Sequence, residues 1–430
     1  DAETGKPLEG VVFGLYAQED IKNAAGEVVV EKDALIELGT TDEEGKLVFQ
    51  ADLPHGKYYI QEVEHKPGYL PNDEVYSFDA SYTDQTLELL AFSEEISNQP
   101  TITEFTKVDL TGGQEIEGAK MQILDQEGKV VEEWVSKKEA HVVYALAPGE
   151  YILHEEQAPT EQGYVRAEDV KFVVEETGDV QKVKMEADHT KVSISKTDIT
   201  DGKEIEGAKL QILDQDGEVV ESWTTGEEHL IEYLPVGTYT LHEEAAVDGY
   251  IVANDVEFTV EETGEIQKMK MEDERAMGQL VIVKTDTDSK AALEGVEFVL
   301  LEKETGKEVG RLKTGKDGKA VSELLPIGTY ENGVFKEPIT YVLKETATLK
   351  GYEKTEEEWE IVFTYQNDKT PVIEVVKEIQ NKKIPETPGT VKPGPKTGDD
   401  TNWFLPLLAL GVSAGMVAGL LYYRKRHKKA

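Results

Sequence analysis

The segment TYVLKETA, Thr340 to Ala347, alternates in the way a β-strand does. Because successive side chains of a strand point to opposite faces, Tyr341, Leu343 and Glu345 share one face of this segment. The tyrosine and the leucine mark that face as the one that enters an apolar core. The sequence therefore predicts a strand that carries a glutamate into the interior of a β-sheet domain.

The same pattern of tyrosine, apolar residue and glutamate occurs three more times. The segments are GKYYIQE, GEYILHE and GTYTLHE, and their inward glutamates are Glu62, Glu155 and Glu243. A single inward glutamate could belong to an edge strand and bend out to water. Repetition at domain spacing favours a shared role for these glutamates.

Longer stretches of the chain are also repeated. EIEGAKMQILDQEGKVVEEW (115–134) and EIEGAKLQILDQDGEVVESW (204–223) are near copies, and Lys107, Lys196 and Lys284 lie 89 and 88 residues apart. Each repeat contains short β-forming runs separated by Gly, Asp and Pro turns, with little helical periodicity. We predict an all-β chain of tandem β-sandwiches. The predicted domains, called repeats 1 to 4 below, span residues 1–99, 100–189, 190–276 and 277–383.

The C-terminal part of the chain differs in composition from the repeats. Residues 384–402 are rich in Pro and Gly, which is typical of an extended linker. Residues 403–430 contain an apolar run that is long enough to span a bilayer, followed by RKRHKK. The basic tail places that end in the cytoplasm by the positive-inside rule. We therefore predict one transmembrane helix, with the repeats outside the cell.

Composition restricts the partners and the chemistry of the chain. Its 430 residues carry a formal net charge of −42, which argues against nucleic acid because phosphate binding requires clustered Lys and Arg. The same charge disfavours adhesion to an anionic membrane surface. Cysteine is absent, which excludes disulfides and thiolate metal sites, and the histidines show no ligand spacing. We expect neither a cofactor nor a metal.

Each complete repeat places two further polar side chains on apolar faces. Lys284 shares a face with Leu280 and Ile282, and Asn381 shares one with Ile379. A buried lone charge is costly, and a buried ion pair often barely offsets its desolvation. One interpretation is a structural ion-pair network. The other is a reaction that removes the charges, in which a neutral lysine amine attacks the Asn or Asp carbonyl and glutamate moves the protons.

The K-x-D opening, the Y-x-L-x-E strand and the closing Asn or Asp resemble the Cna-B or SpaA-type domains of Gram-positive surface proteins and pilins. The resemblance covers residues 1–383 and implies Ig-like or prealbumin-like sandwiches that form autocatalytic intramolecular isopeptide bonds. For repeat 4 it implies a bond between Lys284 and Asn381, with Glu345 as catalyst. The corresponding residues are Lys196, Asp273 and Glu243 in repeat 3, and Glu62 and Asn98 in repeat 1, whose lysine would precede Asp1.

Repeat 2 departs from the complete pattern. It contains Lys107 and Glu155, but alternation places Ala187 where repeat 3 has Asp273. The neighbouring Asp188 faces the other side of the strand unless a β-bulge turns it inward. A bond in this repeat would join Lys107 to Asp188.

The C-terminal segments resemble the LPXTG-like sorting signal of Gram-positive wall-anchored proteins. KPGPKTG, the apolar run and the basic tail follow one another in the order found in that signal. The resemblance implies a sortase that cuts between Thr397 and Gly398 and joins the threonine to peptidoglycan. Pro395 and Lys396 complete the motif, and Gly394 stands where the family has leucine. A plain membrane anchor is the alternative.

These features predict an extracellular, cell-wall-anchored stalk or adhesin stabilised by isopeptide bonds. The expected partners are sortase, peptidoglycan, the membrane before processing, and a host or matrix ligand. Bond formation would be single-turnover and self-directed, so the protein is not expected to be an enzyme. The alternatives are a minor pilus subunit and the non-catalytic part of a secreted carbohydrate-active protein. A YPK lysine motif is absent, which disfavours a polymerising pilus shaft.

Overall fold

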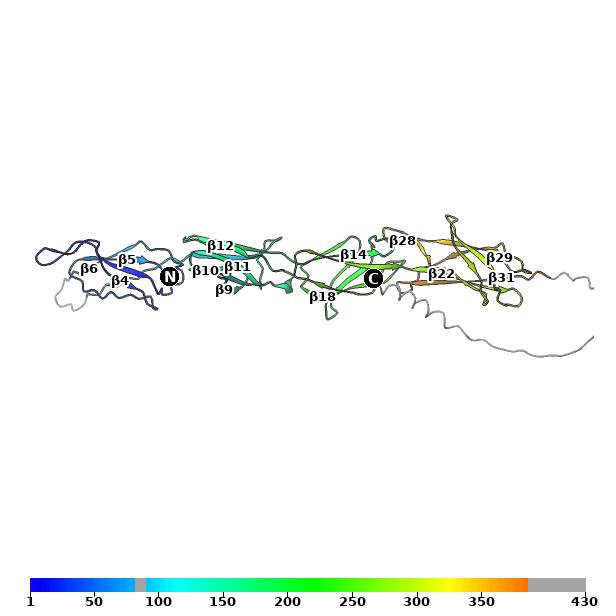
Figure 1. Ribbon diagram of the computed structural model, residues 1–430, viewed down its shortest axis with the longest axis horizontal. Helices are drawn as coiled ribbons and strands as arrows, with labels where there is room; N and C mark the ends of the chain where they lie inside the picture. The colour runs from blue at the N-terminus through cyan, green and yellow to red at the C-terminus, as the bar shows by residue number, and fades with distance from the viewer. Residues whose placement is uncertain (82–89, 386–430) are drawn as a thin grey trace, which may run out of the picture. The chain divides into compact units, whose positions relative to one another are not determined.

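The computed structural model describes residues 1–81 and 90–385. Within this part of the chain the fold consists of β-strands joined by turns, with a single short 3-10 helix, η1 (Thr160–Gln162) (Figure 1). The all-β prediction is therefore confirmed. No helix in the described residues is long and apolar enough to cross a bilayer. The predicted sorting motif and transmembrane run lie outside the described residues.

Repeat 4 shows the architecture most completely. One sheet contains, in order, β24 (Glu308–Lys313), β23 (Glu297–Glu302), β29 (Thr340–Ala347) and β30 (Glu358–Val362). In the other sheet, β22 (Met277–Asp286) pairs with β25 (Lys319–Val321), β26 (Leu325–Pro326) and β31 (Val372–Asn381). A separate hairpin consists of β27 (Gly328–Glu331) and β28 (Val334–Pro338).

Repeats 2 and 3 have the same two-sheet plan. Repeat 2 contains β10 (His141–Tyr144), β7 (Ile102–Asp109) and β13 (Val180–Ala187) in one sheet. Its other sheet contains β12 (Val170–Val174), β11 (Gly149–Gln157), β8 (Lys120–Leu124) and β9 (Val130–Val135). Repeat 3 contains β17 (His229–Glu232), β14 (Lys191–Asp198), β21 (Ile266–Arg275) and β19 (Tyr250–Ile251). Its second sheet contains β16 (Val219–Thr224), β15 (Lys209–Leu213), β18 (Gly237–Ala245) and β20 (Val256–Val260).

The first and last strands of repeats 2, 3 and 4 are parallel neighbours in one sheet. Their register is the same in all three repeats, because the K-x-D aspartate of the first strand faces the equivalent position of the last strand. The facing pairs are Asp109 and Ala187, Asp198 and Asp273, and Asp286 and Asn381. This register establishes that Ala187, Asp273 and Asn381 occupy equivalent positions.

The sandwich core lies between the two sheets, on the faces that strand alternation predicted. Tyr341, Leu343 and Glu345 are all buried, while the alternate residues of β29 are more exposed. The recurring tyrosine is buried in repeats 1, 3 and 4 and partly buried in repeat 2. Its hydroxyl group donates a hydrogen bond to a backbone carbonyl of a preceding segment. These pairs are Tyr58 with Pro54, Tyr151 with Ala147, Tyr239 with Pro235, and Tyr341 with Pro326. Each of these strands is thus tied to a segment that precedes it in its own repeat.

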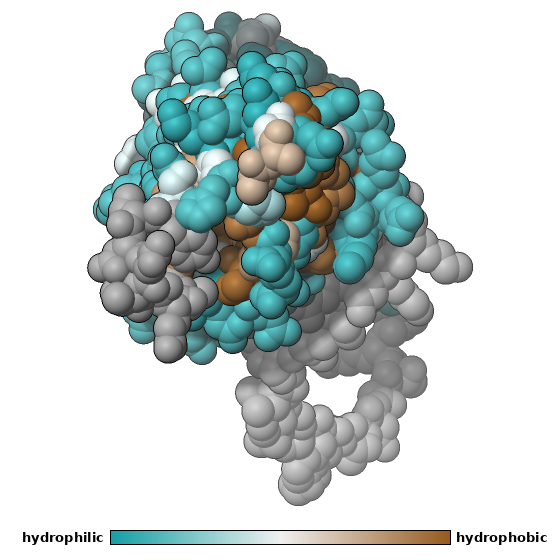
Figure 2. Space-filling model, turned by 90° about the vertical axis from the view of Figure 1, so that its left-hand side faces the viewer, coloured by the Kyte–Doolittle hydropathy of each residue, from teal (hydrophilic) through white to brown (hydrophobic). Residues whose placement is uncertain are grey.

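Repeat 1 is described except for residues 82–89. Its main sheet contains β4 (Leu35–Thr40), β1 (Val12–Ala17), β5 (Lys57–Glu64) and β6 (Val75–Asp79), beside a small hairpin of β2 (Ile21–Lys22) and β3 (Val28–Val30). Residues 90–99, which contain the predicted acceptor, form no strand. Figure 2 shows apolar residues gathered between polar ones on one face of the molecule. In repeat 1, Leu38 and Val48 are among the exposed apolar side chains.

Candidate functional site

In repeat 4 the structure brings the three predicted residues together from three strands. Lys284 on β22, Glu345 on β29 and Asn381 on β31 are 0%, 4% and 2% exposed. The Lys284 Nζ donates to Asn381 Oδ1 at 2.5 Å and to Glu345 Oε2 at 2.8 Å. The Asn381 Nδ2 donates to Glu345 Oε1 at 2.7 Å. One glutamate therefore contacts both the amine and the carboxamide.

The surroundings of this cluster act on the lysine in opposite directions. Burial lowers the pKa of Lys284, while Glu345 opposes that change through its hydrogen bond and its charge. The Phe298 ring lies 5.7 Å from the lysine nitrogen. Thr348 Oγ1 accepts a second hydrogen bond from Asn381 Nδ2 at 2.7 Å, which fixes the carboxamide. Sequence reasoning missed this threonine.

Repeat 3 contains a similar cluster with an aspartate as the acceptor. The Lys196 Nζ bonds directly to Asp273 Oδ1 and lies 3.0 Å from Glu243 Oε2. All three residues are buried. Burial raises the pKa of Asp273 well above its usual range; Lys196 opposes this rise and Glu243 adds to it. The acceptor is therefore shifted toward the neutral acid, the form that can lose water.

Repeat 2 contains a buried lysine and glutamate without an acceptor. The Lys107 Nζ donates to Glu155 Oε2 at 2.8 Å, and both side chains are buried. Ala187, which is 0% exposed, fills the acceptor position. The structure does not bring Asp188 to this pair, because its carboxylate accepts a bond from Lys191 Nζ at 2.7 Å. The β7–β13 pairing runs without a bulge to its end.

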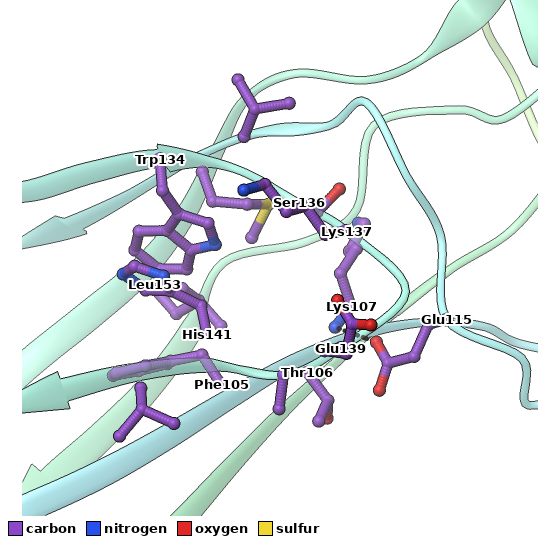
Figure 3. A pocket seen from close by; sticks show the side chains of 14 residues that line it. Phe105, Thr106, Lys107, Glu115, Trp134, Ser136, Lys137, Glu139, His141 and Leu153 are labelled. Carbon is purple, nitrogen blue, oxygen red and sulfur yellow. Dashed lines mark hydrogen bonds between the residues drawn. The ribbon is translucent and has the colours of Figure 1, made fainter.

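A pocket of about 460 Å³ lies beside the pair in repeat 2. It is lined by Phe105 and Lys107 from β7, Trp134 from β9 and His141 from β10, so it lies between the edges of the two sheets. Figure 3 shows the Trp134 and His141 rings lying against each other, with centroids 4.3 Å apart. The sequence did not predict this opening.

Repeat 1 contains the predicted glutamate and asparagine in contact. Asn98, which is 3% exposed, donates from Nδ2 to Glu62 Oε2 at 2.6 Å. The backbone N–H of Asn72 donates to the other oxygen of Glu62 at 3.0 Å. Within residues 1–81 and 90–385, no lysine forms an ion pair with Glu62. The acceptor and the glutamate are thus in place in this repeat.

The family of the chain follows from its similarity to known domains. A family model described as SpaA, prealbumin-like fold domain matches residues 1–92, 101–189, 190–275 and 278–338. The chain belongs to the SpaA prealbumin-like domain family. The prediction of tandem SpaA domains is therefore confirmed, although the boundaries given above stay predictions.

The solved structures that are similar to the chain include the following three. The first is the Bacillus anthracis TIE protein, 23% identical, with 88% of this chain and 69% of that chain covered and a TM-score of 0.47. BcpA, the major pilin subunit of Bacillus cereus, is 15% identical over 66% of this chain and 99% of its own, with a TM-score of 0.39. The major pilin SpaD from Corynebacterium diphtheriae is 16% identical over 66% and 97%, with a TM-score of 0.31. No curated protein matches the chain.

The SpaA domains contain a second recurring contact that sequence reasoning missed. In repeat 3 the K-x-D aspartate, Asp198, accepts hydrogen bonds from the Tyr250 hydroxyl at 2.8 Å and from Arg275 Nε at 2.6 Å. In repeat 1, Asp1 accepts one from the Tyr69 hydroxyl at 2.9 Å. Both tyrosines directly follow a glycine, in the Gly-Tyr (GY) pairs Gly68–Tyr69 and Gly249–Tyr250, and such a pair recurs in each repeat. The joint recurrence of K-x-D and GY was the signal that could have revealed this contact.

Proposed function

We propose that the chain is an extracellular stalk or adhesin of the Gram-positive cell surface, in which SpaA domains 3 and 4 carry intramolecular isopeptide bonds. The observation that supports these bonds best is the mutual contact of Lys284, Glu345 and Asn381 in a buried site. Three polar groups from three strands are costly to bury. An amide between Lys284 and Asn381 removes the lysine charge. The groups beside Glu345 are then uncharged.

The proposed reaction in repeat 4 uses only these three side chains. Lys284 passes a proton to Glu345, and the neutral amine attacks the Asn381 side-chain carbonyl carbon. A new C–N bond forms, and Glu345 delivers its proton to Nδ2 and takes the second proton from the lysine nitrogen. The old C–N bond breaks to release ammonia, and Glu345 is left protonated. In repeat 3 the protonated carboxyl of Asp273 reacts with Lys196, with Glu243 as the proton carrier, and releases water.

We expect the chain to be lighter than its sequence by one ammonia and one water. The first loss belongs to the pair Lys284 and Asn381, and the second to Lys196 and Asp273. Intact mass spectrometry of the purified chain measures the sum, and branched peptides after digestion assign each bond. In Lys284→Ala the loss of ammonia should disappear, and the loss of water from repeat 3 should remain. A wild-type mass equal to the unmodified sequence would contradict the proposed bonds.

Anchoring to the wall is a second part of the proposal. Pro393 and Pro395 precede Thr397 in the sequence, and prolines disfavour a helix, which suits an enzyme that reads an extended segment. Gly394 offers no side chain to an apolar pocket, and loss of a buried leucine contact costs roughly 1.5–3 kcal/mol. We therefore expect a sortase tolerant of this glycine to leave Thr397 linked to peptidoglycan. Digested cell walls should yield a peptide that ends at Thr397, whereas an intact apolar run in the membrane fraction would favour the plain anchor.

Tandem SpaA domains are equally compatible with a pilus subunit. Such a subunit would be joined covalently to other subunits, whereas a wall-anchored stalk would remain a single chain. Denaturing electrophoresis of a wall extract separates the two functions, because a pilus gives a ladder of high-mass species.

A further inference from the structure

Repeat 2 differs from repeats 3 and 4 in one feature of its buried cluster. Ala187 is fully buried at the register position that Asp273 and Asn381 occupy in the other repeats. An alanine side chain offers no carbonyl for Lys107 to attack. The Lys107 and Glu155 side chains nevertheless remain paired at 2.8 Å. Repeat 2 therefore keeps its lysine and glutamate but has no acceptor.

The strand arrangement determines how tension loads each repeat. Tension along the chain enters repeat 2 at the start of β7 and leaves it at the end of β13. These strands are parallel, with Ile102 facing Val180 at one end and Asp109 facing Ala187 at the other. Force is therefore applied at opposite ends of the strand pair, and the two strands are sheared past each other. Repeats 3 and 4 have the same geometry.

A bond between the first and last strands changes this loading. In repeat 4, Lys284 and Asn381 are 97 residues apart in the chain, and a bond between them carries tension directly from β22 to β31. In repeat 3, Lys196 and Asp273 are 77 residues apart. The residues between each bonded pair then lie outside the load path, and the repeat cannot lengthen by unfolding.

Repeat 2 has no such connection. The Lys107–Glu155 pair joins β7 to β11 in the opposite sheet, so it does not link the first strand to the last. Backbone hydrogen bonds and side-chain packing hold β7 against β13. A pocket of about 460 Å³ also lies beside β7.

We infer, on the basis of the proposed bonds in repeats 3 and 4, that repeat 2 is an extensible element of the stalk. Under tension it unfolds and lengthens the chain while repeats 3 and 4 keep their length. Residues 101–189 match one SpaA domain. Their release adds roughly 300 Å of extended chain, at about 3.4 Å per residue. A load that would otherwise act on the wall linkage is then absorbed by unfolding.

Single-molecule pulling of the full chain, held by handles at its two ends, tests this inference. We expect an extension step of roughly 300 Å from repeat 2. To assign the step, ten Gly and Ser residues are inserted in the exposed turn at Glu127, which should lengthen it by about 34 Å. If no step responds to this insertion before the handles detach, the inference is overturned.

Ala187→Asp supplies the matched variant, because it recreates the side chains of repeat 3. We expect it to lose one further water by mass and to lose the marked step. Ala187→Asp combined with Lys107→Ala cannot form the bond in repeat 2. This double variant should therefore lose no further water by mass, and it should still show the marked step. If Ala187→Asp forms the bond by mass but the marked step persists, the inference is overturned. If the mass of Ala187→Asp shows no bond, the result of the insertion at Glu127 alone supports or overturns the inference.

A failure of the proposed bonds gives a different result. An insertion in the equivalent turn of repeat 3, at Asp216, should leave every step unchanged when Lys196 and Asp273 are joined. A step that lengthens with this insertion would contradict the bond in repeat 3. It would also contradict the proposed difference between an extensible repeat 2 and a repeat 3 of fixed length. The marker in repeat 2 would still report whether that repeat extends.

Discussion

Lys196→Ala is expected to destabilise repeat 3 strongly, because it removes both the proposed bond and the cation that contacts two buried carboxyl groups. Asp273 and Glu243 are 0% and 2% exposed. Loss of a cross-link over 77 residues costs about 4–5 kcal/mol in the chain-entropy model. An unpaired buried charge costs roughly 3–5 kcal/mol, although the two losses need not add. Hydrogen exchange of β14 and β21 amides measures the loss within this repeat.

The destabilisation of Lys196→Ala should depend on pH. Burial raises the pKa of Asp273 above its value of about 3.9 in an unfolded chain, and removal of Lys196 takes away the charge that opposes this rise. A folded-state pKa above the unfolded value stabilises the fold at low pH, and this contribution is lost as pH rises through the folded-state value. The variant should therefore be closer to wild type near pH 4 than at pH 7.

Adding Asp273→Ala to Lys196→Ala provides the control for this pH dependence. The double variant lacks the carboxyl that titrates, so most of the difference between the two pH values should disappear. An equal loss of stability in Lys196→Ala at both pH values would contradict the assignment to Asp273.

Glu345→Gln is expected to leave repeat 4 without its bond while preserving the fold. Glutamine has the shape of glutamate, but it cannot take the proton from Lys284 or return one to Asn381. Repeat 4 of the variant should therefore release no ammonia, and the variant should be heavier than the wild type by about that mass. The free energy of unfolding of the repeat should fall by about 4–5 kcal/mol. A drop of that size lowers the melting temperature of a domain of this length by roughly 15–30 °C.

A matched control for this substitution is Glu358→Gln on the neighbouring strand β30. Its side chain is 53% exposed and pairs with Lys344 at the surface, where an ion pair contributes little. The control should form the bond and melt like the wild type. A Glu345→Gln protein that has lost ammonia would show that another group carries the proton.

Strand alternation was sufficient to predict which side chains meet inside each sandwich. The two-residue period is a local property, so it placed Lys284, Glu345 and Asn381 on inward faces without knowledge of the sheet order. It also placed Ala187 inward and Asp188 outward, as in the structure. Because no bulge interrupts β13, that parity holds to the end of the strand.

Contacts from loops could not be predicted in the same way. The backbone N–H groups of Ala167 and Ala253 each donate to the inward glutamate of their repeat at 2.6 Å. Their positions depend on how the loops return across the sheet, and no local period encodes that path. One local signal was overlooked: Asn332 and Gly333, with φ of 50° and 68°, form the turn of the β27–β28 hairpin, and an Asn-Gly pair favours such a turn.

The position of Lys284 and Asn381 near the C-terminal ends of the first and last strands has a consequence for survival among proteases. Most of repeat 4 lies between these two residues, including the turns that join β23 to β30. Once they are joined, cleavage of a single peptide bond in that interval leaves both fragments covalently attached. Under the proposed wall anchoring, a molecule nicked in this interval would keep its preceding domains attached, whereas a cut outside the bonded interval would release them.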